Sequence, residues 1–133
     1  MIFADASALI SIITGEPDAA ELADRLGADR QRLCSALSVW ETVAGLCHSY
    51  MFSVPSARTH VRRFLDVDGF QFVAIGEPEF EIAADAYAQF GKGRHPAALN
   101  MGDCYAYACA KANQATLLFT SDDFGKTDIA TGG

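Results

Sequence analysis

The chain has 133 residues, half of them hydrophobic, which is enough for one domain with its own buried core over residues 1–133. Its net charge of −7 at pH 7 disfavours a nucleic-acid partner, since such proteins usually present basic surfaces. No basic residue precedes the apolar run of residues 6–13, and Asp5 lies beside that run, so we expect a cytoplasmic protein with neither a secretory signal nor a membrane span.

The cysteines are Cys34, Cys47, Cys104 and Cys109, and they form no C-x-x-C pair. Cys104 and Cys109 lie five residues apart on one predicted helix and therefore point in different directions. This spacing favours neither disulfides nor a zinc site. We expect all four to serve as small buried apolar groups.

The first elements place a carboxylate at the end of a strand. Residues 2–4 are an apolar strand that ends at Asp5, and Ser7 precedes a helix over residues 8–14. A carboxylate at the carboxyl end of a first strand, with a hydroxyl two residues later, suits a metal or phosphate site in an open α/β sheet. Capping of the following helix explains Asp5 and Ser7 equally well.

The next elements lead to a second acid, Glu41. A helix from Pro17 to about residue 27 and a strand over residues 33–36 are predicted as scaffold. A helix then runs from Ser38 to about residue 52, and its core-facing positions at helical spacing are Val39, Val43, Leu46 and Tyr50. Ser38 and Glu41 match a capping box, so Glu41 taken alone is interpreted as a helix cap.

The middle of the chain reads as surface and scaffold. Residues 56–67 predict a surface helix with a basic flank, and residues 70–75 predict a strand. A helix from Pro78 to residue 90 follows, with an apolar repeat that predicts a core-facing stripe of Phe80, Ala83, Ala84, Tyr87 and Phe90. The loop over residues 91–96 carries Lys92 and Arg94, which are candidate phosphate contacts, although its glycines also fit a helix end and a turn.

The last third of the chain contains the remaining acids. Asn100 is predicted to cap a helix to about residue 112, which puts Asp103 in the first turn, where the helix dipole favours negative charge. Residues 116–119 form an apolar run typical of a strand covered on both faces in a parallel sheet. Asp122 and Asp123 follow the carboxyl end of that strand, where ligands bind in such sheets.

An alternating strand and helix order brings these separated acids toward one edge of a parallel sheet. Carboxylates without a histidine or cysteine cluster indicate Mg²⁺ or Mn²⁺. Such ions activate water and orient phosphodiesters, and a pair of them sits about 4 Å apart. They would also offset the acidic net charge where a phosphate binds.

The segments that hold these acids resemble the PIN-domain ribonucleases, in particular the VapC-type toxins of toxin–antitoxin pairs. These segments are FADASAL around Asp5, SVWE ending at Glu41, NMGDCYAYACA around Asp103, and LLFTSDDFGKTDI over residues 117–129. The resemblance implies an α/β PIN-domain fold, a Rossmann-like three-layer α/β/α sandwich with a central, mainly parallel sheet. It also implies a Mg²⁺- or Mn²⁺-dependent endoribonuclease, an RNA substrate such as tRNA or rRNA, a homodimer, and a VapB-type antitoxin whose tail covers the active site.

The resemblance assigns roles position by position. Asp5 and Asp103 match the principal metal ligands, and Glu41 matches the acid on the third helix. Asp122 or Asp123 matches the fourth acid, and Asp123 is the better match because it directly precedes Phe124. Asp128 matches a further acid of the pattern, and Ser121 stands where the family usually has glycine. The residues themselves make Ser7, Ser121, Asp128, Lys92 and Arg94 candidates for supporting or RNA-binding roles.

Two other functions remain open from the residues alone. The first is a PIN-like scaffold that binds a partner or RNA without cutting it, which intact acids at every matching position disfavour. The second is another acid-cluster metalloenzyme, such as a phosphohydrolase. A phosphohydrolase of the haloacid-dehalogenase type would need an acid two residues after Asp5, and Ser7 stands there.

Overall fold

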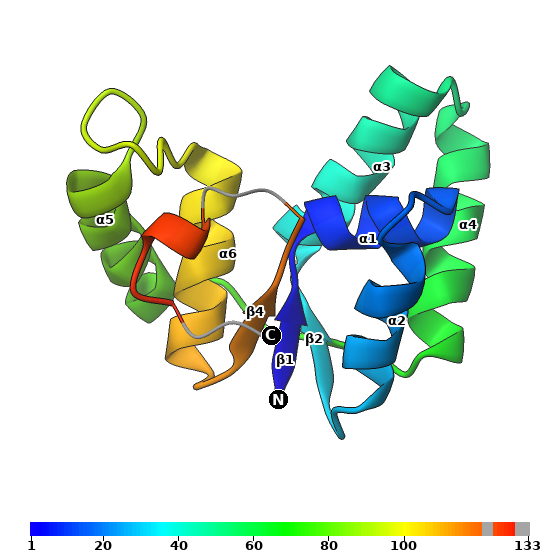
Figure 1. Ribbon diagram of the computed structural model, residues 1–133, viewed down its shortest axis with the longest axis horizontal. Helices are drawn as coiled ribbons and strands as arrows, with labels where there is room; N and C mark the ends of the chain where they lie inside the picture. The colour runs from blue at the N-terminus through cyan, green and yellow to red at the C-terminus, as the bar shows by residue number, and fades with distance from the viewer. Residues whose placement is uncertain (121–123, 130–133) are drawn as a thin grey trace.

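A parallel sheet forms the centre of the protein in the computed structural model, which describes residues 1–120 and 124–129 (Figure 1). In that part of the chain, strand β1 (Ile2–Ala4) pairs with β2 (Arg32–Cys34) on one side and with β4 (Thr116–Leu118) on the other. A short strand β3 (Gln71–Phe72) extends the sheet beyond β2, giving the order β3-β2-β1-β4 with all pairs parallel.

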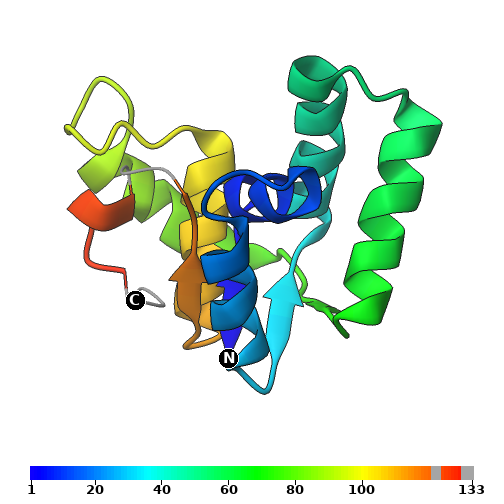
Figure 2. The same cartoon turned by 45° about the vertical axis from the view of Figure 1, so that its right-hand side comes forward.

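Side chains that alternate along the strands pack into two separate hydrophobic cores, one on each face of the sheet. Phe3 packs into a cluster with α5 (Glu77–Phe90) and α6 (Met101–Ala112), which cover one face of the sheet. Ile2 and Ala4 point the other way, into a cluster with α1 (Ala6–Thr14) and α2 (Ala19–Gly27). Figures 1 and 2 show the resulting layers, and the predicted three-layer α/β/α sandwich is confirmed.

Helices α3 (Ala36–Tyr50) and α4 (Val54–Val67) form a two-helix unit beside β2. Their shared core contains Cys34, Leu46, Ala57, Val61 and Leu65. Ser53 caps α4 by accepting a hydrogen bond from the backbone amide of Ser56, and Pro55 occupies the first turn, where a missing amide hydrogen costs little. Cys34, Cys104 and Cys109 are buried as predicted, and Cys47 is half-buried. None of the helices in the described part of the chain is both long and apolar enough to cross a membrane.

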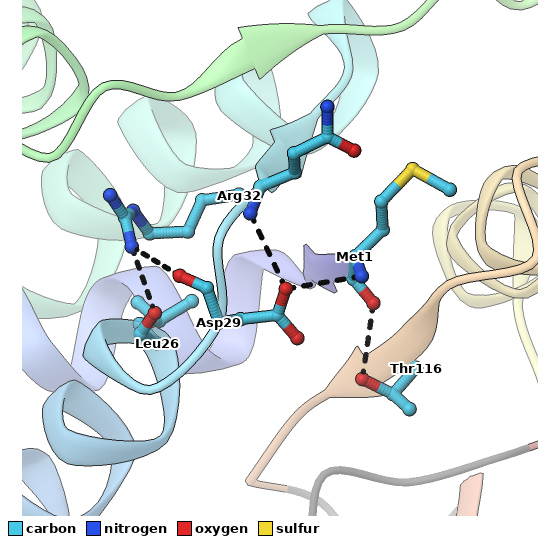
Figure 3. Close-up of polar contacts among 6 residues, drawn as sticks. Met1, Leu26, Asp29, Arg32 and Thr116 are labelled. Carbon is cyan, nitrogen blue, oxygen red and sulfur yellow. Dashed lines mark hydrogen bonds and ion pairs between the residues drawn. The ribbon is translucent and has the colours of Figure 1, made fainter.

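The amino-terminal edge of the sheet is fastened by polar contacts (Figure 3). Arg32 donates to the carbonyl oxygens of Leu26 and Asp29 at 3.1 and 2.8 Å. The terminal amino group of Met1 pairs with the Asp29 carboxylate at 3.1 Å. The charged groups of Met1, Asp29 and Arg32 therefore stabilise this edge of the sheet. The candidate functional acids lie toward the opposite edge.

The start of α3 differs from its prediction. Ser35 caps the helix through a reciprocal pair with Ser38: Ser35 Oγ accepts from the Ser38 amide at 3.1 Å, and Ser38 Oγ accepts from the Ser35 amide at 3.0 Å. The predicted capping box of Ser38 and Glu41 is therefore wrong, because the helix begins three residues earlier. Glu41 is thereby free of the capping role that its sequence position favoured.

The predicted buried face of α5 is also wrong in part. Ala83 and Ala86 are buried, whereas Phe80 is 52% exposed and Tyr87 is 45% exposed. The buried alanines share a cluster with small residues of α6, so the two helices approach closely and large side chains are left at the flanks. The predicted strand over residues 70–75 is likewise reduced to Gln71–Phe72, both exposed at the sheet edge.

Candidate active site

The carboxyl ends of β1 and β4 define the point where the chain reverses its direction of winding. From β1 the chain moves through α1 and α2 to β2, and later returns through α5 and α6 to β4 on the other side of β1. Ligands of open α/β sheets bind outside such a switch point. Asp5 directly follows β1 there.

Asp5 is a helix cap and a buried acid at once. Its Oδ2 accepts hydrogen bonds from the Ser7 amide at 3.2 Å and the Ser7 hydroxyl at 2.7 Å. The residue is only 6% exposed, and burial raises the pKa of its carboxyl group. The capping role is confirmed, and the contact that caps α1 also fixes the orientation of the carboxylate.

Ser7 joins the two strand ends. Its hydroxyl oxygen accepts a hydrogen bond from the Thr120 amide at 3.1 Å, while the Asp5 amide donates to the Leu118 carbonyl at 3.0 Å. The chain leaving β4 is therefore attached to the start of α1. The predicted acids Asp122 and Asp123 and their neighbour Ser121 come next in the chain, and all three lie outside the described residues.

Glu41 reaches the same edge from α3. A Cβ atom added to Gly102 of α6 would lie 2.0 Å from Glu41 Oε2, so the carboxylate occupies the space that a side chain at residue 102 would need. The pKa of Glu41 is raised to about 7, first by burial and then by the negative charges of Asp5 and Asp103. Asp5 and Asp103 therefore lie within electrostatic range of Glu41.

Asp103 lies in the first turn of α6 as predicted. Its amide donates to Asn100 Oδ1 at 2.9 Å, and its Oδ2 accepts from the Asn100 amide at 3.1 Å, so the pair forms a reciprocal cap. This contact sets the position of the Asp103 carboxylate relative to Gly102 and Glu41.

The donor chemistry of Asp5, Glu41 and Asp103 fits a hard divalent cation. As placed, however, no three His, Cys, Asp or Glu side chains of residues 1–120 and 124–129 lie close enough together to hold one. The raised pKa of Glu41 is consistent with this separation of the acids, because carboxylates with no cation among them repel one another. A divalent cation would offset this repulsion and draw the flexible carboxylates together.

Asp128 contacts two side chains of α6 that follow Asp103 along the helix. The Tyr107 hydroxyl donates to its Oδ1 at 2.5 Å, and Lys111 Nζ lies 3.3 Å from its Oδ2. These contacts, with that to Tyr107 the stronger, lower the pKa of Asp128. Sequence reasoning missed Tyr107 and Lys111, although Asp103, Tyr107 and Lys111 repeat every four residues and so share one face of the helix.

The basic loop folds back toward the start of α6. The Lys92 amide donates to the Leu99 carbonyl at 3.0 Å, directly before the Asn100 cap. Lys92 and Arg94 are both exposed, and the Arg94 guanidinium lies 5.2 Å from the centre of the Tyr87 ring. The structure therefore places the Lys92 backbone beside Leu99, just before α6, and the Arg94 guanidinium against the Tyr87 ring.

Known proteins with similar sequences show the family to which this chain belongs. The PIN domain family model matches residues 2–128. Ribonuclease VapC30 of Mycobacterium tuberculosis is 39% identical over 127 residues, which cover 96% of this chain and 95% of that protein. VapC ribonuclease R02377 of Rhizobium meliloti is 36% identical over 141 residues, covering 97% and 99% of the two chains.

Solved structures share the fold at low sequence identity. VapC20 of Mycobacterium tuberculosis, described as a toxin that cleaves the sarcin-ricin loop, superimposes with a TM-score of 0.76 at 13% identity, over 98% of this chain and 97% of that one. A chain of VapBC2 from Rickettsia felis, bound to a fragment of promoter DNA, gives 0.75 at 14% identity, over 98% and 96%. The chain is a PIN domain and belongs to the VapC ribonuclease family.

Proposed function

We propose that this protein is a Mg²⁺- or Mn²⁺-dependent endoribonuclease that acts as the toxin of a toxin–antitoxin pair. The observation that carries the proposal is the position of the Glu41 carboxylate against Gly102, within electrostatic range of Asp5 and Asp103. Three acids from separate elements lie on the switch-point side of the sheet, within electrostatic range of one another, and the curated relatives are named as ribonucleases.

Asp5, Glu41 and Asp103 would hold the metal, together with a fourth acid, Asp123 or Asp122. The bound cation supplies an activated water and neutralises charge on the scissile phosphodiester. Ser7 keeps the Asp5 carboxylate in one orientation through its two hydrogen bonds, and Asn100 does the same for Asp103. Lys92, on the loop that leads to Asn100, is suited to contact a phosphate of the RNA.

The proposed substrate is tRNA or rRNA, the proposed partner is a VapB-type antitoxin, and the proposed assembly is a homodimer in the cytoplasm. Support for the partner comes from similar folds solved as a VapBC2 assembly and as a toxin–antitoxin complex from Klebsiella pneumoniae. Support for the substrate comes from VapC20, whose description names the sarcin-ricin loop. We also propose that residues 1–133 form a single domain.

The test is cleavage of total tRNA and rRNA by the purified protein. We expect cleavage in Mg²⁺ or Mn²⁺, none in EDTA, and none by Asp103→Asn in any of these buffers. The exposed Asp85→Asn on α5 is the matched control and should cut like the wild type. Cleavage that survives chelation, or that persists in Asp103→Asn, contradicts the mechanism; RNA binding without cleavage by the wild type would favour the scaffold function instead.

A further inference from the structure

A pocket of about 570 Å³, lined by apolar side chains, hydroxyls and two carboxylates, lies beside the candidate active site. One wall is a face of α1 with Ser7, Ile10 and Ser11, which are spaced as neighbours on a helix. The remaining lining comes from the segment after α1 and from the end of α3, chiefly Glu16 and Tyr50. Its volume is within the range of pockets that bind small organic ligands, about 300 to 1,000 Å³.

The pocket opens onto the catalytic edge through two residues that it shares with that edge. Ser7 and Thr120 both line it, and they are joined by the hydrogen bond from the Thr120 amide to Ser7 Oγ. The Ser7 hydroxyl in turn donates a hydrogen bond to the Asp5 carboxylate. Ser7 would therefore lie between a ligand in the pocket and Asp5, a proposed metal ligand.

The two carboxylates of the pocket, Glu16 and Asp18, are acceptors held in place by hydrogen bonds. The Tyr50 hydroxyl donates to Glu16 Oε1, and the Ser11 hydroxyl donates to Asp18 Oδ1. Each carboxylate is therefore held by a hydroxyl on a helix. Its lining residues, all of them described, include no lysine or arginine, so the pocket repels a phosphate and favours a group that donates N–H hydrogen bonds.

We propose that this pocket binds the base of a guanine nucleotide close to the scissile phosphate. The proposal rests on the ribonuclease activity proposed above and assigns that site its base preference. Guanine presents two adjacent N–H donors on its Watson–Crick edge, and a carboxylate presents two adjacent acceptors. The ring of Tyr50 and the side chain of Ile10 provide apolar walls for a flat base.

The other bases fit the two acceptors of Glu16 less well. Adenine and cytosine each place one amino donor beside a ring acceptor, which would face a carboxylate oxygen. Uracil has a single N–H between two carbonyl groups. Glutamine at residue 16 would present one acceptor and one donor, the pattern that matches adenine.

The experiment compares the wild type with Glu16→Gln on a single-stranded RNA that has a randomised central region, with cut positions read by sequencing. We expect the wild type to favour guanine at one fixed position near the cut. Glu16→Gln should lower the ratio of guanine to adenine there by about fivefold or more, the scale of one bidentate pair. Glu81→Gln, an exposed site on α5, is the matched control and should leave the ratio unchanged. Because glutamine Oε1 can still accept from Tyr50, thermal unfolding of Glu16→Gln should match the wild type.

A binding measurement separates failure of this inference from failure of the proposed activity. In EDTA, fluorescence anisotropy would compare two short labelled RNAs that differ by one guanine-to-adenine change. Tighter binding of the guanine RNA by the wild type, lost in Glu16→Gln, supports the pocket even if the wild type cuts nothing. Equal affinity for both RNAs, or an unchanged base ratio in Glu16→Gln, overturns it.

Discussion

The Glu41 carboxylate rests on Gly102, one residue before Asp103, and a Cβ atom at residue 102 would come within 2.0 to 2.6 Å of its three terminal atoms. Glycine at this position therefore leaves the space that the Glu41 carboxylate occupies at the acidic edge. The contact explains why a glycine, usually costly inside a helix, stands in the first turn of α6. It also connects two acids that lie far apart in the sequence.

Gly102→Ala should leave the protein folded but impair cleavage. The clash is with the flexible end of Glu41, which can swing away, while alanine adds about 1 kcal/mol of helix propensity. We expect an unchanged or higher melting temperature and a loss of RNA cleavage approaching that of Glu41→Gln. Gly27→Ala in α2, where nothing lies within 4 Å of the added Cβ, is the control and should cut normally. Normal cleavage by Gly102→Ala would mean that the position of Glu41 is unimportant.

Glu41→Gln should keep the fold and change the pH dependence of stability. The pKa of Glu41 rises from 4.5 to about 7 on folding, so between these values the folded state binds more protons than the unfolded state. The free energy of unfolding of the metal-free protein therefore falls as pH rises through this window, by roughly 1 to 2 kcal/mol once solvent screening of this half-exposed group is allowed for.

In Glu41→Gln the part of this decline that is due to Glu41 should disappear, and the part due to the raised pKa of Asp5 should remain. Denaturant titrations at several pH values in EDTA measure the effect, with Glu81→Gln as the control. The same variant should cut RNA at least about a hundredfold more slowly. A wild-type pH profile together with wild-type cleavage would remove Glu41 from the acid cluster.

Binding of Mg²⁺ or Mn²⁺ should stabilise the wild type, because a ligand that binds only the folded state raises its stability with concentration. Asp5→Asn should lose most of this rise in melting temperature. Its metal-free stability should be equal or higher, since asparagine can still accept from Ser7 and a like charge is removed from the cluster. Calorimetry with and without metal is the measurement. A metal-dependent rise of wild-type size in Asp5→Asn would place the cation elsewhere.

Tyr107→Phe should destabilise the protein by about 1 kcal/mol at neutral pH, because Asp128 loses a hydrogen bond from α6. The pKa of Asp128 is lowered on folding, so its stabilising contribution is present above the ordinary value of 3.8 and is lost as pH falls further. The difference from wild type should therefore shrink below pH 3.8. Tyr105→Phe, whose hydroxyl has no hydrogen-bond partner among the described residues, is the control. A difference that stays constant with pH would mean that the Tyr107 hydroxyl acts independently of the Asp128 charge.

The sequence by itself determined the features that depend on neighbouring residues. The strand that ends at Asp5, the Asn100 cap with Asp103 in the first turn, and the apolar strand at residues 116–118 all follow from patterns within a few residues. Alternation of strands and helices then predicted the parallel three-layer sandwich, because parallel strands need crossover helices. Motifs around the acids were specific enough to identify the PIN-domain family.

Tertiary structure alone decided which partner each of these residues meets. Glu41 and Gly102 are brought together by the packing of α3 on α6, and no periodicity in either segment encodes that contact. The buried face of α5 was chosen by close packing of Ala83 and Ala86 on α6, against the larger apolar surface of Phe80 and Tyr87. Helical spacing shows which residues share a face, but the shape of the neighbouring helix determines which face is buried, because a close fit between helices depends on both surfaces at once.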